Sequence, residues 1–516
     1  MGLKKLPIGI STFKTIIENS YIYVDKTDIA LDLIENGQYY FLSRPRRFGK
    51  SLFLDTLRTI FDGDKEIFKG LHIYDKYEFV KYPIIRISFN DGNFKTKEEF
   101  RQTIYEILKT NQRDLTITCD DDLSLSGCFR ELIYKAYEKH NQKVVILIDE
   151  YDKPILDNIE NSEIAKIMRE ELKNFYSVIK GADEYLKFVF ITGVSKFSKV
   201  SLFSGLNNIQ DITLHPKYTT ICGYTQKDIE SVFSEHLKGQ DFEKIKKWYN
   251  GYKFLGEGVY NPFDILLFIS NEFMYRNYWF STATPTFLLK LIEKNRYFLP
   301  NLESIVKDEM MLNSFDVDCI ELETLMWQTG YLTITHISEN YDGTPLFHLE
   351  IPNYEVKTSL INSFADFMSK IEHNSVVYKN NIYKSLLDQD VLSLEKELKA
   401  LYSAIPYNLF TNNKMYEYEG YYVSVFYSYI KALGVELIGE DVTNKGRIDL
   451  TLKLPQAIYV IEFKVDGTNA LAQIKEKNYH EKYLNENKPL YLIGIEFDTK
   501  ARNISKVEFE EVDFKN

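Results

Sequence analysis

Gly49-Lys50-Ser51 is the first group of residues in this sequence that could carry chemistry. In a phosphate-binding loop, a glycine-containing turn directs backbone N–H groups at phosphate oxygens, the lysine reaches the β- and γ-phosphates, and the serine hydroxyl binds Mg²⁺. The fit is incomplete, because Arg44 stands where such a loop normally has its first glycine. A lone G-K-S tripeptide is common by chance, so a nucleotide site needs a second signal.

That second signal is a pair of carboxylates at the end of an apolar run. Residues 143–149 read KVVILID, and Glu150 follows. Such a run predicts a strand buried on both faces of a parallel sheet. An acidic residue at the carboxyl end of this strand is placed to hold nucleotide-bound Mg²⁺. We predict that Asp149 holds Mg²⁺ through water and that Glu150 orients the attacking water as general base. A solvated Asp-Glu pair without function is the alternative.

A third group lies near the end of the chain, where residues 458–465 read IYVIEFKV. Alternation along a strand places Glu462 and Lys464 on one face, and burying both is costly unless they bind something. Asp449 lies thirteen positions before Glu462, on the neighbouring strand of a predicted hairpin. The two carboxylates can then meet and form an oxygen-ligand site suited to Mg²⁺. The alternative is an exposed Glu-Lys salt bridge.

The elements around the first two groups alternate between strands and helices. Apolar spacing predicts a helix over 25–36, a strand over 39–42 and a helix after Ser51 that ends before Gly63. Strands over 84–89, 143–149 and 187–191 alternate with helices over 98–109 and 128–139, which is typical of an α/β fold. Thr192 follows the strand over 187–191 and could sense the γ-phosphate. An ordinary glycine-containing turn explains it equally well.

The middle of the chain is predicted to be helical and rich in aromatic residues. Residues 223–298 fit a helical lid behind the nucleotide. A helix over 321–330, a hairpin of strands 331–336 and 347–351, and a helix after Pro352 resemble a winged-helix module. We favour a structural role for this module over DNA binding, because it is not visibly basic. Helices over 374–401 lead to the last domain.

Length and composition limit the broad class of protein. The 516 residues suggest about three domains. The net charge of −12 argues against polyanion binding over the whole surface. Cys119, Cys128, Cys222 and Cys319 lack zinc-site spacing and suggest reduced thiols. The N-terminal stretch lacks an apolar leader run and no run reaches about 18 apolar residues, so we expect a cytoplasmic protein without a membrane span.

Several motifs follow one another along the chain. They read FLSRPRRFGKSL, ILIDEYDKPI, FITGVSKFS, GLNNIQDIT, WYNGYKF, YNPFDIL and YWFSTATPTFL. Together they resemble the bacterial AAA-ATPase-like family whose members carry a C-terminal PD-(D/E)xK nuclease domain. The resemblance runs from about Leu6 to about Tyr483, and an arginine at the Arg44 position is usual in that family.

The resemblance implies a fold and a nucleotide site. The fold is α/β: an additional-strand, AAA-like P-loop ATPase core (1–222), a helical lid (223–300), a winged-helix-like module (301–372) and a restriction-endonuclease-like PD-(D/E)xK domain (373–516). ATP would be bound with Mg²⁺ on Ser51 and Asp149, with Thr192 nearby. The loop would comprise Arg44, Pro45, Arg46, Arg47, Phe48, Gly49, Lys50, Ser51 and Leu52.

The resemblance also assigns roles in the last domain. Asp449 and Glu462 would bind Mg²⁺, with Mn²⁺ an alternative ion, and Lys464 would activate or position water and stabilise charge on the phosphate. Glu419, in the preceding helix, matches a further metal-side carboxylate. Gln473, in the following helix, matches the Q-x-x-x-K-x-Y stretch that includes Lys477. Ile448 stands where the family name has proline, a common departure.

We therefore expect an ATP-regulated, metal-dependent nuclease that acts on nucleic acid, with DNA favoured, and works as a homo-oligomer. The pairing of these activities suits defence against foreign DNA or maintenance of mobile elements, and defence is our hypothesis. Arg44, Arg46 and Arg47 are candidates for phosphate contact within the chain, and Lys196 or Lys199 for contact in a neighbouring copy. A signalling or scaffolding NTPase that oligomerises with ATP, with a C-terminal domain that only binds nucleic acid, is the main alternative. A peptide-remodelling motor ranks last.

Overall fold

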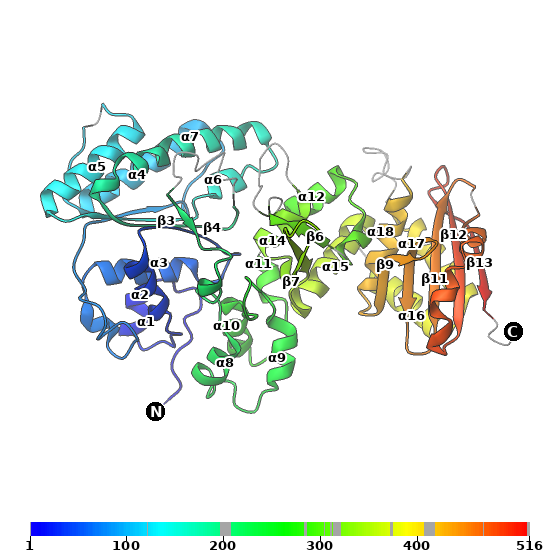
Figure 1. The fold of residues 1–516 in the computed structure, drawn as a ribbon. Helices are drawn as coiled ribbons and strands as arrows, with labels where there is room; N and C mark the ends of the chain where they lie inside the picture. The colour runs from blue at the N-terminus through cyan, green and yellow to red at the C-terminus, as the bar shows by residue number, and fades with distance from the viewer. Residues whose placement is uncertain are drawn as a thin grey trace. The chain divides into compact units, whose positions relative to one another are not determined.

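The computed structural model of the chain forms two compact units (Figure 1). The first unit comprises residues 1–287 and 306–355, and the second comprises residues 288–305 and 356–516. The four predicted domains, with boundaries at 222, 300 and 372, do not coincide with these two units and stay a prediction. The structure describes residues 2–120, 122–196, 208–282, 286–303, 305–309, 312, 321–371, 375–406, 418–467 and 469–512. Lys199 and Cys319 lie outside these ranges.

A five-stranded parallel sheet forms the centre of the first unit, in the order β2-β3-β4-β1-β5. Its strands are β1 (Tyr39–Ser43), β2 (Ile84–Ser88), β3 (Val144–Asp149), β4 (Leu186–Gly193) and β5 (Gln210–Asp211). Every residue of β3 is buried, as the apolar run predicts. Because β4 lies between β1 and β3, the loop after β1 and the residues that end β3 and β4 meet at one edge of the sheet.

Helices cover both faces of this sheet (Figure 1). The helix α3 (Lys50–Phe61) packs against β3 from one side. The other side carries α4 (Lys97–Asp114), α5 (Leu125–His140) and α7 (Ser162–Gly181). Side-chain caps from Thr96, Ser124 and Asn161 begin these three helices. Shorter helices are α1 (Phe13–Glu18), α2 (Thr27–Asn36) and α6 (Lys153–Leu156). The alternating α/β prediction is confirmed.

The remainder of the first unit is helical and aromatic, with one small sheet. It contains α8 (Gln226–Val232), α9 (Phe242–Tyr249), α10 (Pro262–Ser270), α11 (Tyr278–Thr282) and α14 (Leu322–Thr329). A hairpin of β7 (Thr333–Glu339) and β8 (Pro345–Glu350) joins β6 (Ile305–Asp308) in the order β6-β8-β7. The helix α15 (Tyr354–Ser369) follows and carries the chain from the first unit into the second.

The second unit is built on a mixed sheet in the order β13-β12-β11-β10-β9. Its strands are β9 (Glu436–Thr443), β10 (Gly446–Lys453), β11 (Ile458–Val465), β12 (Leu490–Asp498) and β13 (Asn503–Glu511). Phe463 of β11 packs on Phe426 of α18 (Glu419–Lys431). Val460, on the opposite face, shares a cluster with Ile474 of α19 (Ala470–Glu476). The unit also holds α12 (Thr286–Lys294), α16 (Ser375–Leu387) and α17 (Val391–Ser403).

In the part of the chain that the structure describes, every helix is too short or too polar to cross a membrane.

Candidate functional site

The loop between β1 and α3 has an unusual backbone. Arg47 and Gly49 have φ values of +68° and +93°, and a left-handed conformation is uncommon for a residue with a side chain. Gly49 begins α3 without a side-chain cap, so the first N–H groups of the helix have no capping side chain. Such a terminus is suited to a phosphate group.

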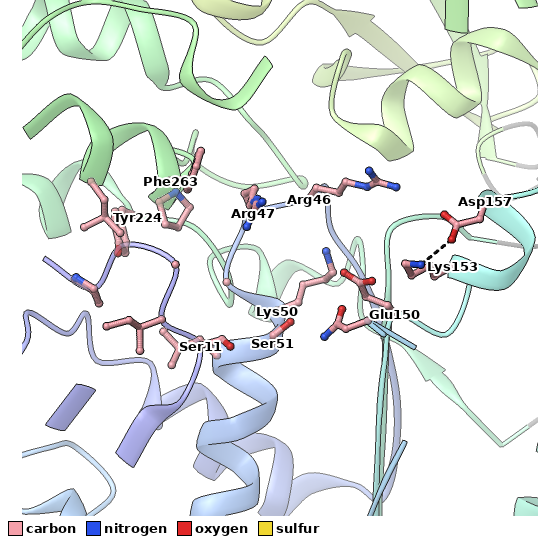
Figure 2. A pocket seen from close by; sticks show the side chains of 18 residues that line it. Ser11, Arg46, Arg47, Lys50, Ser51, Glu150, Lys153, Asp157, Tyr224 and Phe263 are labelled. Carbon is pink, nitrogen blue, oxygen red and sulfur yellow. Dashed lines mark hydrogen bonds and ion pairs between the residues drawn. The ribbon is translucent and has the colours of Figure 1, made fainter. Parts of the chain in front are cut away.

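A cavity of about 560 Å³ lies over this loop (Figure 2). Its volume suits a bound small molecule. One part of its wall is polar and is formed by Asn90, Glu150 and the loop residues Arg46, Arg47, Lys50 and Ser51. Gly49 and Leu52 line it as well, whereas Arg44, Pro45 and Phe48 do not. The structure thus brings together six of the nine predicted loop residues.

Lys50 is buried and folds back onto its own loop. Its Nζ atom donates hydrogen bonds to the backbone carbonyls of Arg44 (2.8 Å) and Pro45 (2.9 Å). Burial lowers the pKa of Lys50, and the nearby carboxylates of Asp149 and Glu150 oppose this shift. The ammonium therefore stands between the loop carbonyls and the acidic residues, where an anionic ligand could replace the carbonyls as its partner.

The two acidic residues at the end of β3 have different surroundings. Asp149 is fully buried, and its Oδ1 atom accepts a hydrogen bond from Thr192 Oγ1 at 2.7 Å. Asp149 and Thr192 do not line the cavity, but Asn90, which does, donates to Asp149 Oδ2 at 3.5 Å. Glu150 lines the cavity and has a φ of +52°. Burial raises the pKa of Glu150 above its ordinary value. Its role as a general base stays a prediction.

Arg44 differs from the prediction that it contacts phosphate. Its guanidinium is 1% exposed and donates to the backbone carbonyls of Ser43, Thr213 and Tyr218. It also lies over the ring of Phe254, 3.7 Å from the ring centroid. Arg44 therefore ties the loop to the segment after β5, and Arg46 and Arg47 are the loop arginines at the cavity.

Lys196 also differs from its predicted role in a neighbouring copy. It is buried, and its Nζ atom forms an ion pair with Asp211 Oδ2 at 2.8 Å. Its backbone N–H donates to Gln328 of α14. Lys196 thus serves the interior of its own chain. The other candidate, Lys199, is not among the described residues.

Sequence reasoning missed a second wall of the cavity. Segments far apart in the chain supply it, namely Pro7 and Ser11 from the N-terminal stretch and Tyr224 and Phe263 from the region predicted as a lid. Tyr224 lies just before α8, and Phe263 is the second residue of α10. The YNPFDIL motif contains Phe263 and was the available signal. Its role depends on the fold, which brings the Arg47 guanidinium to 5.0 Å from the centroid of the Phe263 ring.

The second candidate site lies where β10 and β11 separate. Their ladder runs from Lys453↔Ile458 to Leu450↔Ile461. At the next position the Asp449 carboxylate accepts the backbone N–H of Phe463 at 2.8 Å. The side chain of Asp449 thereby takes the place of a strand carbonyl, and its carboxylate is held beside Glu462, as predicted.

Glu462, Lys464 and Glu419 converge at this point. Lys464 Nζ lies 3.2 Å from Glu462 Oε1 and 3.7 Å from Glu419 Oε1. Glu462 is 1% exposed, and its Oε2 atom has no hydrogen-bond partner within the described chain. A buried carboxylate oxygen without a partner is costly, so this atom calls for a ligand. Gln473 of α19 donates to Glu462 Oε1 and holds that oxygen in place.

The electrostatics of this cluster are those of crowded, buried carboxyl groups. Burial raises the pKa of Asp449 to about 6. Burial, with the neighbouring Asp449, raises the pKa of Glu462 to about 8. Burial lowers the pKa of Lys464, but Glu462, Asp449 and Glu419 raise it overall, so Lys464 stays charged. Excess negative charge of this kind favours a cation.

The donor set fits a hard divalent ion, since Asp449 and Glu462 present carboxylate oxygens and one of these oxygens has no partner. Among the described residues, however, no three His, Cys, Asp or Glu side chains are close enough together to hold an ion. Lys464 stands between Glu419 and Glu462 instead. The metal roles of Asp449, Glu462 and Glu419 therefore stay predictions.

Comparison with known proteins divides the chain in the same way as these two sites. Residues 7–203 match a family described as predicted AAA-ATPase, and residues 417–507 match one described as PD-(D/E)XK nuclease superfamily. The chain is 45% identical over 512 residues, 98% of each chain, to a protein of Azotobacter chroococcum mcd 1 described as "Uncharacterized protein in vnfD 5'region". No solved structure matches the chain.

Proposed function

This chain belongs to the bacterial AAA-ATPase-like family whose members carry a C-terminal PD-(D/E)xK nuclease domain, and on that premise we propose that it is a metal-dependent nuclease controlled by ATP. Its favoured substrate is DNA. The observation that carries this proposal is Glu462 Oε2, a buried carboxylate oxygen without a hydrogen-bond partner, on the strand beside Asp449.

In the proposed reaction a phosphodiester bond is hydrolysed at the end of β11. Asp449 and Glu462 would hold Mg²⁺ or Mn²⁺, with Glu419 as a further carboxylate. An ion bound there supplies a more acidic water and a positive charge near the scissile phosphate. The Lys464 ammonium, 3.2 Å from Glu462, would stabilise the negative charge that the phosphate gains in the transition state. Gln473 would fix the orientation of Glu462.

The proposed ATP site is the cavity over the loop after β1. Arg46, Arg47 and Lys50 offer positive charge to the phosphates there. Ser51 and Asp149 would hold Mg²⁺, and Glu150 would orient the attacking water. The strand order β2-β3-β4-β1-β5 supports an additional-strand P-loop domain. On the same basis α8 to α11 would form its lid, and α14, β7, β8 and α15 would form the winged-helix-like module.

Under the proposed control, the nucleotide bound at the first site would either inhibit or permit cleavage at the second site. Assembly into a homo-oligomer, a cytoplasmic location and a role in defence against foreign DNA belong to the same proposal. The role in defence rests on the pairing of an ATPase-like segment with a nuclease-superfamily segment in one chain.

A cleavage assay tests the proposal. Purified full-length protein is incubated with linear, circular and single-stranded DNA and with RNA, with Mg²⁺ or Mn²⁺, and with or without ATP. We expect metal-dependent cleavage that is lost in Glu462→Ala and in Lys464→Ala. Lys506 and Glu508 form a matched ion pair (2.7 Å) on the outer strand β13, so Glu508→Ala and Lys506→Ala should cleave normally.

Two outcomes would contradict the proposal. Absence of cleavage under every metal and nucleotide condition would rule out the nuclease. ATP-dependent assembly with full biological effect in Asp449→Ala would instead favour a signalling or scaffolding NTPase.

A further inference from the structure

A tryptophan outside the cavity wall holds the nucleotide loop. The indole Nε1 of Trp279, in α11, donates to the backbone carbonyl of Arg46 at 3.1 Å. Asn261 Nδ2, at the start of α10, donates to the same oxygen at 3.4 Å. Trp279 is fully buried. Arg46 precedes Arg47, whose φ is +68°, so the held carbonyl adjoins the strained part of the loop.

Two buried carboxyl groups hold Trp279 in turn. Its backbone N–H donates to Asp264 Oδ1 (2.9 Å) and to Glu355 Oε1 (2.8 Å), and the N–H of Phe280 donates to Glu355 Oε1 (3.2 Å). Asp264 and Glu355 are fully buried, and the pKa of Asp264 is raised well above its ordinary value by burial and by the neighbouring Glu355 carboxyl. Ionisation of both carboxyl groups is opposed by burial and by their mutual repulsion, so the pair favours a protonated form.

A glycine at the end of α14 lets this helix approach the same part of the loop. Gly330 ends α14 with a φ of +94°. A Cβ atom there would lie 2.8 Å from Pro45 Cβ and 3.3 Å from Trp279 Cζ2. The loop is therefore packed against α14 directly and is hydrogen-bonded to α11.

We propose that Asp264, Trp279 and Glu355 form a clasp that positions the Pro45–Arg46 part of the nucleotide loop and links it to the start of α15. Trp279 is a positioning residue, because it acts on the nucleotide through Arg46. Glu355 is the second residue of α15, the helix that leads from the first unit into the second. The clasp thus connects the nucleotide loop to the start of α15, so that nucleotide binding can change the conformation there. The nucleotide role of the loop and this last step rest on the proposed ATP-controlled nuclease.

Hydrogen exchange in the nucleotide-free, full-length protein tests the clasp without reference to activity. Trp279→Phe keeps a ring but removes the indole donor, and Glu355→Ala removes the acceptor that holds Trp279. We expect each variant to increase exchange in peptides that cover residues 43–51. Glu355→Gln keeps an oxygen acceptor for the two N–H groups and gains a donor for Asp264, so it should leave exchange of the loop near that of the wild type.

Tyr249→Phe provides the matched control. Tyr249 is buried in α9, and its hydroxyl donates to the Arg276 carbonyl and accepts the Arg276 N–H, both at 3.1 Å. Loss of this hydroxyl removes two hydrogen bonds from the same helical region but none from the loop. Its exchange in residues 43–51 should be unchanged. If Trp279→Phe also leaves exchange of the loop unchanged while it is folded by circular dichroism, the clasp is wrong.

Affinity for ATP provides the second measurement. Loss of one hydrogen bond that positions the loop should weaken binding of a fluorescent ATP analogue roughly fivefold in Trp279→Phe, with no such change in Tyr249→Phe or Glu355→Gln. An unchanged affinity in Trp279→Phe would overturn the positioning role.

The link to α15 is tested separately from the nuclease itself. In Trp279→Phe, nucleotide should lose its effect on cleavage, whereas cleavage without nucleotide should persist. Increased exchange of the loop together with unchanged nucleotide control would retain the clasp and overturn the link. Absence of cleavage in the wild type would overturn the proposed function and leave the exchange result standing.

Discussion

The Asp449 carboxylate accepts the backbone N–H of Phe463 at 2.8 Å, so a side chain replaces a backbone carbonyl at the position where β10 and β11 part. This bond fixes one oxygen of Asp449 and leaves the carboxylate beside Glu462. Asp449 therefore has an observed structural role and a predicted catalytic role, and a substitution can test the two roles separately.

Asp449→Asn should abolish cleavage without unfolding the protein. The amide oxygen can still accept the Phe463 N–H, but the negative charge offered to a metal ion is lost. We expect a reduction in cleavage rate on the order of a hundredfold or more, with a change in melting temperature of only a few degrees. Single-turnover cleavage and thermal melting measure the two effects. Cleavage at the wild-type rate would exclude Asp449 from the site.

Lys50→Ala should weaken the proposed ATP binding more than Lys153→Ala does. Both lysines line the same cavity, but Lys153 is paired with Asp157 at 2.7 Å. Among the described residues, Lys50 donates to two loop carbonyls, which a phosphate can replace. A charge-assisted contact to phosphate predicts a loss of affinity on the order of tenfold or more for Lys50→Ala. Calorimetric titration with ATP measures both variants, and equal losses would argue against a special role for Lys50.

Arg44→Lys should lower stability more than Arg47→Lys. Lysine cannot reproduce the three carbonyl contacts of the buried Arg44 guanidinium or its stacking on Phe254. We expect a loss of about 2 kcal/mol in the free energy of unfolding, measured by urea denaturation. Arg47 is exposed at the cavity, so Arg47→Lys should alter nucleotide affinity with little effect on stability. The reverse order would mean that Arg44 contacts the ligand.

Gly330→Ala should disturb the nucleotide loop, and Gly343→Ala should not. Both glycines have a left-handed backbone, with φ of +94° and +80°, but only Gly330 faces a close neighbour, Pro45. Because alanine has a strained backbone at both positions, this strain cancels when the two variants are compared. The remaining difference in the free energy of unfolding measures the contact with Pro45. We expect Gly330→Ala to be less stable by about 1 to 3 kcal/mol than Gly343→Ala, by urea denaturation. Equal free energies of unfolding would show that the loop accommodates the added Cβ atom without loss of stability.

The Glu355 carboxyl should make stability depend on pH. Burial raises its folded-state pKa from 4.5 to about 7, so the folded protein keeps a proton that the unfolded chain releases. This contribution to stability is fully present below the unfolded value of 4.5 and is lost as the pH rises through about 7. Subtracting the unfolding free energy of Glu355→Gln from that of the wild type should therefore give a difference that falls between pH 5 and pH 8. A flat difference would mean that Glu355 is ionised in the folded protein.

Local patterns were sufficient for the elements that carry both candidate sites. The run VVILID forms β3, and the alternation of IYVIEFKV places Glu462 and Lys464 on one face of β11. A strand, a loop and a helix around Gly49 follow from residues close together in the chain. These features were predictable because periodicity and turn chemistry act over a few residues.

Tertiary structure decided which side chains face the cavity. Arg44 and Arg46 are two positions apart in one basic loop, and sequence alone treats them alike. Arg44 turns inward because a carbonyl 169 positions away accepts its hydrogen bond, and the Arg46 carbonyl is held by Trp279, 233 positions away. Partners at such separations leave no local periodicity, so the clasp of Asp264, Trp279 and Glu355 exists only once the chain has folded.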